Sequence, residues 1–316
     1  MASLGICAII RNEALYLREW IAFHVLQGVS QFRLYDNGSS DDTEYIIKSA
    51  QHCNLTLINW VYPKQHFDRV QRRAYLDGAS KLIGSVDFVA FIDVDEFLFA
   101  ETGQGLAKAL DDYDSNVGAI AINQRIFGSS GRRKYSNGYV TSRFIKSTEP
   151  TDPESRWVKT IARPECVEIF DSVHSVKLRQ GCYVLRDGAK FEPESRHPGC
   201  SARIAPSSSI GLYHYMLKSI EEYEWKQIRW RHTKIADRYN SNYFEDRNAV
   251  ANKIRLDRLA AYRSDINHMI KFIWQNKNVN LTIKDFAGKH AIGRSPDRTK
   301  VGGEPLSAIR SSKLAK

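Results

Sequence analysis

The sequence has no long hydrophobic run. Among its 316 residues, no apolar stretch approaches the roughly 20 residues that a membrane-spanning helix requires. The first apolar run, Leu4 to Ile10, stops at three polar residues, so it is too short for the hydrophobic part of a signal peptide. We therefore expect a cytoplasmic protein, with any membrane contact limited to a peripheral one at an anionic inner face.

Cysteine is also scarce. The five cysteines are odd in number, widely spaced and without a CxxC pair. Small disulfide-stabilised domains and zinc modules use regularly spaced cysteines, so the sequence argues against both classes and favours a reducing compartment.

Basic residues outnumber acidic ones. The 46 Lys and Arg against 36 Asp and Glu give a formal net charge of +10, which favours an anionic partner. Nucleic acid, an anionic membrane and a phosphorylated substrate all satisfy this condition. Hydrophobic residues make up 42% of the chain and aromatic residues 11%, enough to form a substantial folded core.

The first hundred residues alternate short apolar runs with segments of helical periodicity. We predict strands at 4–10, 32–35, 55–60 and 88–92, and helices at 14–26, 43–50 (with Ser40 as N-cap) and 69–83. This order predicts an α/β fold with a Rossmann-like, mostly parallel sheet flanked by helices. Residues 1–235 would form the main α/β domain, 236–288 a helical C-terminal extension with helices at 247–262 and 266–274, and 289–316 a basic, mobile tail.

Acidic residues follow the most apolar of these strands. Asp93, Asp95 and Glu96 come directly after the run 88–92, at the edge of an open α/β sheet where ligands bind. Carboxylate oxygens suit Mg²⁺ or Mn²⁺, which often share such ligands with substrate phosphates. The alternative is that Asp93 and Asp95 form a turn or cap a helix.

Several segments taken together resemble a known family. They are Arg11-Asn12-Glu13, Tyr16 to Trp20, His24, Gly28-Val29, Tyr35 to Asp41 and Phe91 to Phe97. These motifs are similar to those of glycosyltransferases of family 2 and the related family 92, which share the GT-A fold. The resemblance covers about the first 235 residues in element order, and it is dense over the first 100.

The resemblance implies roles for residues of the first half of the chain. Arg11, Asn12 and Glu13 would lie beside the nucleotide of the donor. Asp36 would accept hydrogen bonds from the uracil or ribose, and the alternative is an aspartate that only forms the turn. Gln71 would face the donor, although its neighbours Arg72 and Arg73 are alternatives.

The resemblance also implies a metal site for Mn²⁺ or Mg²⁺. Asp93 would hold the ribose or a metal-bound water, Asp95 would bind the metal, and His214 would supply a third ligand through a neutral imidazole. Packing in an aromatic strand is the alternative for His214. Two residues of a later stretch complete the implied donor site: Trp157 as an apolar platform for a sugar ring and Lys159 as a phosphate contact.

The catalytic base has no clear motif. Asp171 and His174 are the favoured candidates because they adjoin the stretch that resembles family 92, and Glu192 and Glu194 are alternatives. Basic residues at 132–134 and on the helix face of Lys226, Arg229, Arg231 and Lys234 could approach phosphates, although solvated surface charge is the commoner situation.

The implied function is inverting transfer of a sugar from a nucleotide-diphosphate donor to a carbohydrate or glycolipid acceptor. A UDP-sugar is the expected donor, and family 92 suggests UDP-galactose. One alternative is a basic nucleic-acid-binding protein, but no binding module is recognisable. The other is a metal-dependent nucleotidyltransferase, which would need a phosphate-cradling loop that the first strand does not supply.

Overall fold

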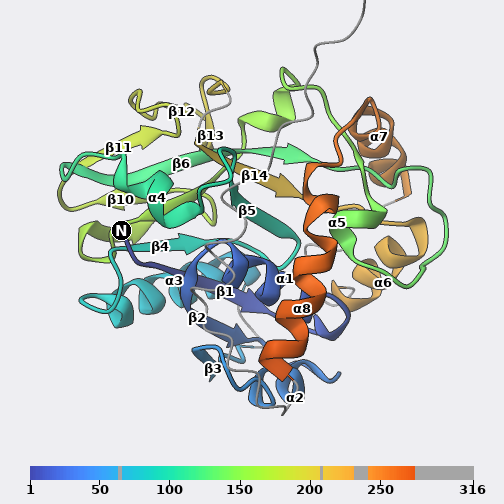
Figure 1. The fold of residues 1–316 in the computed structure, drawn as a ribbon. Coiled ribbons are helices and arrows are strands. Elements are labelled where there is room, and N and C mark those ends of the chain that lie inside the picture. Colours follow the sequence, from blue (N-terminus) through green and yellow to red (C-terminus); the bar gives the residue numbers. More distant parts are fainter. Residues whose placement is uncertain (63–65, 207–208, 231–240, 275–316) are drawn as a thin grey trace, which may run out of the picture.

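The computed structural model describes residues 1–62, 66–206, 209–230 and 241–274. Its centre is a curled sheet with the strand order β3-β2-β1-β4-β8-β6-β14-β5, with β11 paired to β6 (Figure 1). Five of its strand pairs are parallel and three, those joining β8 to β4 and β6 and β14 to β5, are antiparallel. The predicted α/β class with a mostly parallel sheet is therefore confirmed.

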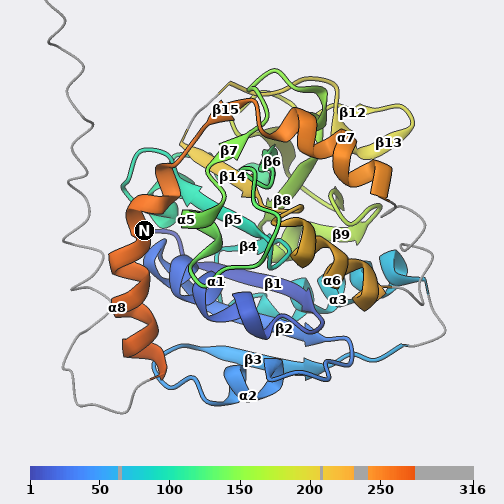
Figure 2. The ribbon, with the colours of Figure 1, turned by 90° about the vertical axis from the view of Figure 1, so that its right-hand side faces the viewer.

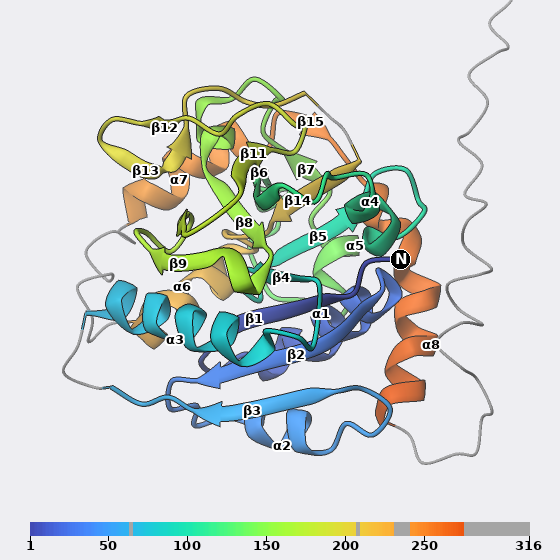
Figure 3. The same cartoon turned by 90° about the vertical axis from the view of Figure 1, so that its left-hand side faces the viewer.

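The first half of the chain forms successive strand–helix units. Its elements are β1 (Leu4–Ile10), α1 (Ala14–Leu26), β2 (Val29–Asp36), α2 (Thr43–Lys48), β3 (Leu55–Asn59), α3 (Phe67–Leu82) and β4 (Phe88–Phe91). Figure 3 shows β1, β2 and β3 side by side with α3 running along them. Alternate residues of β1 enter two hydrophobic clusters, because Ile6 and Ala8 pack with the α1 side and Cys7 and Ile9 with the α3 side.

One close approach fixes α3 against the sheet. A Cβ at Gly78 would lie 2.4 Å from the Sγ of Cys7 on β1, so only glycine permits this distance between helix and strand. The helix bounds also differ from one prediction: α2 begins at Thr43 after Asp42, and Ser40 is not its cap. The backbone N–H of Ser40 instead donates to the Oδ1 of Asn12.

The second half completes the sheet and adds short peripheral elements. They are β5 (Glu96–Ala100), α4 (Leu106–Asp111), β6 (Val117–Ile126), α5 (Val140–Arg143), β7 (Lys146–Ser147), η1 (Pro153–Arg156), β8 (Val158–Ala162), η2 (Pro164–Cys166), β9 (Val167–Phe170), β10 (Val176–Leu178), β11 (Cys182–Leu185), β12 (Pro193–Glu194), β13 (His197–Ser201), β14 (Ile210–His214), α6 (Ile220–Trp230), α7 (Ser241–Ala251), β15 (Ile254–Arg255), η4 (Arg258–Tyr262) and α8 (Arg263–Trp274). The helix predicted at 247–262 is wrong, since β15 and a 3-10 turn interrupt it.

The C-terminal segment packs on the rest of the fold. Helix α8 crosses α1 (Figure 2), and its buried Ile266, Met269 and Ile273 belong to the same hydrophobic cluster as β1 and α1. The predicted tail at 289–316 lies outside the described residues. Within the described part of the chain, no helix has the length and apolar character needed to cross a membrane.

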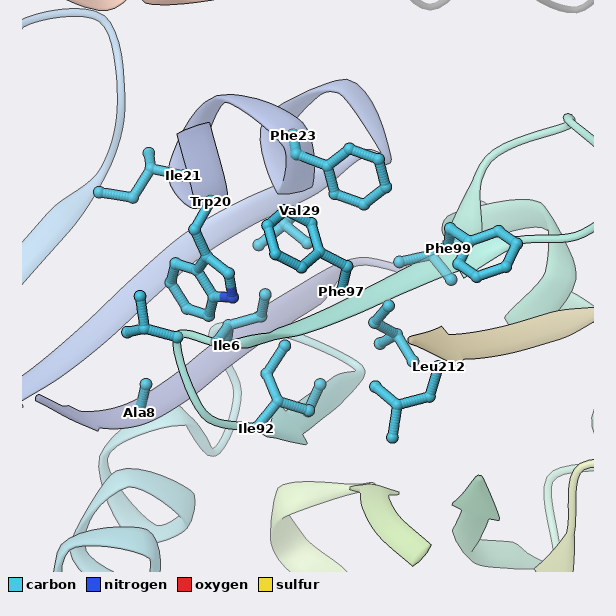
Figure 4. Close-up of a cluster of buried hydrophobic side chains, with 14 of the residues drawn as sticks. Ile6, Ala8, Trp20, Ile21, Phe23, Val29, Ile92, Phe97, Phe99 and Leu212 are labelled. Atoms are coloured by element: carbon cyan, nitrogen blue, oxygen red, sulfur yellow. The ribbon is translucent and has the colours of Figure 1, made fainter. Parts of the chain in front are cut away.

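The main core lies between α1 and the sheet. Figure 4 shows Trp20 and Phe23 projecting from α1 toward Ile6, Ile92 and Phe97. Trp20 is fully buried, and its indole N–H donates to the backbone oxygen of Glu96 at 2.8 Å. The core therefore holds the first residue of β5, immediately after residues 92–95, which we call the acidic turn.

A second polar contact in this core involves His24. Its Nδ1 lies 2.8 Å from the carbonyl oxygen of Trp20, and its Nε2 lies 3.1 Å from the backbone nitrogen of Leu98. Because a carbonyl accepts and an amide N–H donates, the ring is neutral and carries its proton on Nδ1. Burial lowers the pKa of His24 to about 3.

Acid is expected to destabilise the protein through His24. The folded-state pKa lies below the ordinary 6.5, so the unfolded chain takes up the proton first; the stabilisation is complete above pH 6.5 and declines toward pH 3. Between pH 7 and 5 the loss from this residue should be about 2 kcal/mol. Urea unfolding at both pH values measures it.

A variant separates His24 from other titrating groups. His24→Gln should lose about 2 kcal/mol less than the unsubstituted protein over this pH change. The exposed His268 provides the matched control, since His268→Gln should respond as the unsubstituted protein does. An unaltered pH response in His24→Gln would contradict the assignment.

Candidate active site

The acidic turn joins two distant strands of the sheet. Residues 92–95 connect β4, which pairs with β1 and β8, to β5, which pairs with β14. Three hydrogen bonds hold the turn and its ends: Asp93 N to Glu96 Oε2 (2.8 Å), Tyr215 N to the Asp95 carbonyl (2.8 Å), and the Trp20 bond already described. No helix follows, so helix capping does not account for Asp93 or Asp95.

A cavity of about 220 Å³ opens above this turn. Its lining comprises Ile9, Ile10, Arg11, Glu13, Phe67, Gln71, Asp93, Val94, Asp95, Val173, His174, His214, Met216 and Lys226. Seven of the predicted site residues are in this set. The others, Asn12, Asp36, Trp157, Lys159 and Asp171, are not part of the lining.

Asp93 is fixed by partners on both carboxylate oxygens. Oδ1 accepts from Gln71 Nε2 at 2.8 Å and from the hydroxyl of Tyr75 at 3.3 Å. Oδ2 accepts from Lys159 Nζ at 2.7 Å. Burial acts to raise the pKa of Asp93, but the Lys159 ammonium outweighs it, so the pKa is lowered and the group is a carboxylate. About a third of the side chain faces the cavity.

Lys159 lies beneath the acidic turn and not at the cavity, where a phosphate contact would require it. Its side chain is 2% exposed and lies between Asp93 and Glu96, with Nζ 3.4 Å from Glu96 Oε2. Burial acts to lower its pKa, yet the two carboxylates raise it well above the ordinary value. The prediction that Lys159 contacts a phosphate is wrong for this arrangement, because its charge is used beneath the acidic turn.

Glu96 is the most deeply buried acid of the group. Its side chain is 0% exposed, and its Oε1 has no hydrogen-bond partner among the described residues. Burial raises the pKa of Glu96 to about 7. A buried carboxyl with an unsatisfied oxygen is costly, and the Lys159 ammonium 3.4 Å from Oε2 offsets part of that cost.

Asp95 meets two groups that carry or can carry positive charge. Its Oδ2 lies 2.8 Å from Lys226 Nζ, and its Oδ1 lies 3.4 Å from His214 Nε2. Burial acts to raise the pKa of Asp95, but Lys226 and His214 together hold it well below the ordinary range. Asp95 is therefore ionised at neutral pH.

The orientation of His214 follows from a second contact. Its Nδ1 lies 2.8 Å from Gln124 Oε1, while Gln124 Nε2 donates to the carbonyl of Glu154 at 3.3 Å. Gln124 thus presents an acceptor to His214, which places the imidazole proton on Nδ1. In the neutral ring, the Nε2 lone pair then points toward the Asp95 carboxylate.

Asp95 and His214 are therefore suited to act as two ligands of a divalent cation. A lone pair facing a carboxylate at 3.4 Å is repulsive unless a proton or a metal cation lies between them, and imidazole nitrogen with carboxylate oxygen is a suitable ligand pair for such a cation. The described residues contain no group of three or more His, Cys, Asp or Glu side chains arranged as a metal site. Asp93, which is bonded through both oxygens, does not join Asp95 and His214 in the predicted three-ligand set.

The end of β1 contributes a basic group to the cavity. Arg11 lines it, and the Nε of this side chain is buried without a hydrogen-bond partner in the described structure. Asn12 follows with a φ of +54°, which turns the chain away, and its Oδ1 accepts from Ser40 N at 2.7 Å. Arg11 is thus available to an anion, whereas Asn12 holds the β2–α2 loop.

Of the remaining predicted donor residues, Glu13 lines the cavity, whereas Asp36 and Trp157 do not. Glu13 is the N-cap of α1. The Oδ1 of Asp36, at the end of β2, accepts from both the N–H and the hydroxyl of Ser39. Trp157 packs against His174 and His197, with ring centres 5.1 and 5.6 Å apart and the rings tilted by 50°.

The two candidates for the base differ in position. His174 lines the cavity, and its Nδ1 donates to the carbonyl of Val158 at 3.0 Å. Burial lowers the pKa of His174 to about 3, with Lys159 acting in the same direction, which makes it a weak base. Asp171 lies outside the lining, and its Oδ1 accepts from the hydroxyl of Ser175 at 2.6 Å.

Sequence reasoning missed the importance of two lysines. Lys226 appeared only as one charge on a helix face, yet it contacts Asp95. Lys218 has a φ of +59°, is buried, and lies 4.5 Å over the ring of Tyr16. Burial lowers the pKa of Lys218, although Asp95 opposes this. No local sequence pattern gives a signal for either contact, because both partners are far away in sequence.

The cavity and its acidic turn can be compared with known proteins. The sequence model named Glycosyltransferase family 92 matches residues 4–197. The chain belongs to glycosyltransferase family 92. Family 92 proteins of Oryza sativa subsp. japonica and Ricinus communis are each 30% identical to it, over 190 and 181 residues. These matches cover 59% and 56% of this chain but 31% and 32% of the relatives, so the chain spans about a third of their length.

Solved glycosyltransferase structures show a looser likeness. TarS of S. aureus has a TM-score of 0.38 at 14% identity, covering 86% of this chain and 81% of that one. Glucosyl-3-phosphoglycerate synthase from Mycobacterium tuberculosis, in complex with Mn²⁺, UDP-glucose and phosphoglyceric acid, has a TM-score of 0.31 at 17% identity, covering 52% and 58%. The family assignment rests on the sequence matches.

Proposed function

We propose that this family 92 protein is an inverting glycosyltransferase that uses a UDP-sugar, with UDP-galactose the first donor to test. The acceptor would be a carbohydrate or glycolipid. Membership of the family supports transfer of a sugar. The observation that carries the metal-assisted mechanism is the convergence of the Asp95 carboxylate and the His214 Nε2 lone pair at the cavity.

Asp95 and His214 would hold Mn²⁺ or Mg²⁺. When bound, such a cation neutralises negative charge on the diphosphate leaving group. A cation held by one carboxylate and one imidazole takes further oxygen ligands from substrate phosphates, which fits a site with two protein donors. The buried Glu96 lies beside this pair, with its Oε1 3.6 Å from His214 Nδ1.

Basic side chains around the cavity would bind the donor phosphates. Arg11 brings a buried N–H without a partner, and Lys226 reaches the cavity from α6. Lys226 now contacts Asp95, so donor binding would redirect its ammonium toward a phosphate oxygen. Asp93, held rigidly by Lys159 and Gln71, keeps a partly exposed carboxylate that would accept from the ribose hydroxyls.

Sugar transfer also needs a base for the acceptor hydroxyl. His174 is the predicted candidate that lines the cavity, and its fixed Nδ1 proton leaves Nε2 as the nitrogen that could accept a proton. Its low pKa makes it inefficient in the free protein, so a bound donor and cation would have to alter its surroundings.

A donor screen tests the proposal. The protein is incubated with Mn²⁺ and each of a set of UDP- and GDP-sugars, and release of the nucleoside diphosphate is followed with and without EDTA. We expect hydrolysis or transfer from at least one UDP-sugar, and its loss with EDTA because the leaving group is no longer neutralised. The absence of both binding and turnover with every nucleotide sugar would contradict the proposal. Turnover that resists EDTA would contradict the metal.

A further inference from the structure

A second pair of cavities lies outside the site described above. A cavity of about 170 Å³ is formed between β5, β6 and β14 and the C-terminal segment 254–258, and one of about 540 Å³ adjoins the loop 150–156. The two share Arg125, Pro150, Arg186 and Ile204 in their walls. Together they form one basic pocket, here called the Arg125 pocket.

Positive charge exceeds negative charge in the smaller cavity. Three arginines line it, Arg125, Arg186 and Arg258, against a single carboxylate, Glu101. Glu101 is shared, since its oxygens lie 3.3 Å from Arg186 and 3.7 Å from Arg258. The larger cavity adds Arg156, whose partner is Glu194. Glu101 and Asp152 partly offset the charge of Arg125, but neither forms an ion pair with it.

Arg125 differs from Arg156, Arg186 and Arg258 in having no carboxylate partner among the described residues. It is half-buried on β6, its Nη1 donates to the carbonyl of Thr148 at 2.9 Å, and it forms no ion pair with any described residue. Burial lowers its pKa and the nearby Arg186 acts in the same direction, while Tyr213, Glu101 and Asp152 oppose the shift. A desolvated guanidinium beside a second one is unfavourable unless an anion joins them, and five N–H donors in a planar fork suit a phosphate.

The walls of the larger cavity are suited to a ligand that has an organic part as well as a charged group. Pro150, Pro153, Ile204, Ala205 and Pro206 supply apolar surface beside the arginines. A volume of about 540 Å³ lies within the usual range for small-molecule sites. The geometry points to a binding site for a phosphate group carried on a small organic molecule, with Arg125 contacting the phosphate and the proline-rich wall contacting the organic part.

The Arg125 pocket adjoins the candidate active site through one residue. Gln124 lines the smaller cavity, and its side chain holds His214, which lines the cavity above the acidic turn. The two sites thus lie on either side of the Gln124–His214 contact. The inference stands without the proposed transferase activity, since it depends only on the charges and walls of this pocket.

Isothermal titration of the full chain with glucose 6-phosphate, inorganic phosphate and glucose tests the inference. We expect glucose 6-phosphate to bind more tightly than either other probe. Arg125→Met, which keeps the length of the side chain but removes its charge, should weaken that binding about tenfold or more. Arg125→Lys should retain part of it, because the charge remains while the fork is lost.

Two controls locate the bound phosphate. Arg196→Met removes an exposed arginine outside both cavities and should leave binding unchanged. Lys226→Met removes a cation of the other cavity and should also leave it unchanged. Binding that is lost in Lys226→Met but kept in Arg125→Met would overturn the inference, as would no binding at all. Equal affinity for glucose would exclude phosphate recognition, and equal affinity for inorganic phosphate would exclude recognition of the organic part.

Discussion

Replacing Asp95 by Asn is expected to reduce metal-dependent sugar transfer about 100-fold or more while the protein remains folded. The substitution preserves shape but removes the charge that Lys226 and His214 share. Asp95 is ionised at neutral pH because its pKa is held well below the ordinary range, so the full charge is lost. Initial rates of UDP release, with the donor found in the screen and Mn²⁺, measure the effect.

A binding experiment accompanies the rates. Calorimetric titration with UDP should show tighter binding in the presence of Mn²⁺ for the unsubstituted protein and little enhancement for Asp95→Asn. Asp112→Asn is the matched control, because this aspartate is exposed at the end of α4 and outside the cavity. If Mn²⁺ enhances UDP binding equally in Asp95→Asn, Asp95 is not a metal ligand.

Replacing Arg143 by Met is expected to lower the free energy of unfolding by about 3–5 kcal/mol. Arg143 on α5 makes two hydrogen bonds of 2.8 Å to Glu222 on α6, and the side chains are 5% and 0% exposed. The substitution leaves the Glu222 carboxylate buried without its cation, although Tyr16 and Ser219 still donate to it. Urea-induced unfolding at pH 7 measures the difference.

Two further variants separate the buried charge from lost packing. Arg143→Met combined with Glu222→Gln should be more stable than Arg143→Met alone, because no unpaired carboxylate remains. Arg255→Met breaks an exposed pair with Asp257, whose side chains are 69% and 49% exposed, and should change stability by about 1 kcal/mol or less. An equal effect of Arg143→Met and Arg255→Met would show that burial does not determine the cost.

The stability of this pair also bears on the active site. Glu222 and Lys226 lie one turn apart on α6, so the buried contact of Glu222 with α5 fixes the part of the helix that presents Lys226 to Asp95. Tyr16 links the same carboxylate to α1. A protein with Arg143→Met that still folds should therefore position Lys226 less precisely.

The first half of the fold could be predicted because its signals are local. Strand β1 and helix α1 have the predicted bounds, and β2, β3, α3 and β4 differ by a few residues, since each combines a clear apolar period with turn residues at its ends. Strand β5 escaped prediction because Glu96 to Ala100 directly follows the acids, and the polar stretch looked like the start of a loop or helix. Only pairing with β14, more than a hundred residues away, makes it a strand.

The residues of the candidate site also divide into those that local sequence signals predict and those whose contacts depend on distant strands. Arg11, Gln71, Asp93 and Asp95 lie near strand ends or on α3, and they line the cavity as the motif order implied. Lys159 did not keep its expected role, because its burial between Asp93 and Glu96 depends on the antiparallel register of β8 against β4. No local pattern in Arg156 to Thr160 specifies which strand it will join.

The turn between β4 and β5 restricts where the chain of such a protein can change in length during evolution. Residues 92–95 connect the inner strand β4 to the edge strand β5. Strand pairing and core contacts fix both of these strands. Because both ends of this turn are fixed, an inserted residue would displace Asp93 and Asp95 together. Changes in length that alter substrate choice are therefore easier to accommodate in the connections after β6, where the backbone can lengthen without moving the acids.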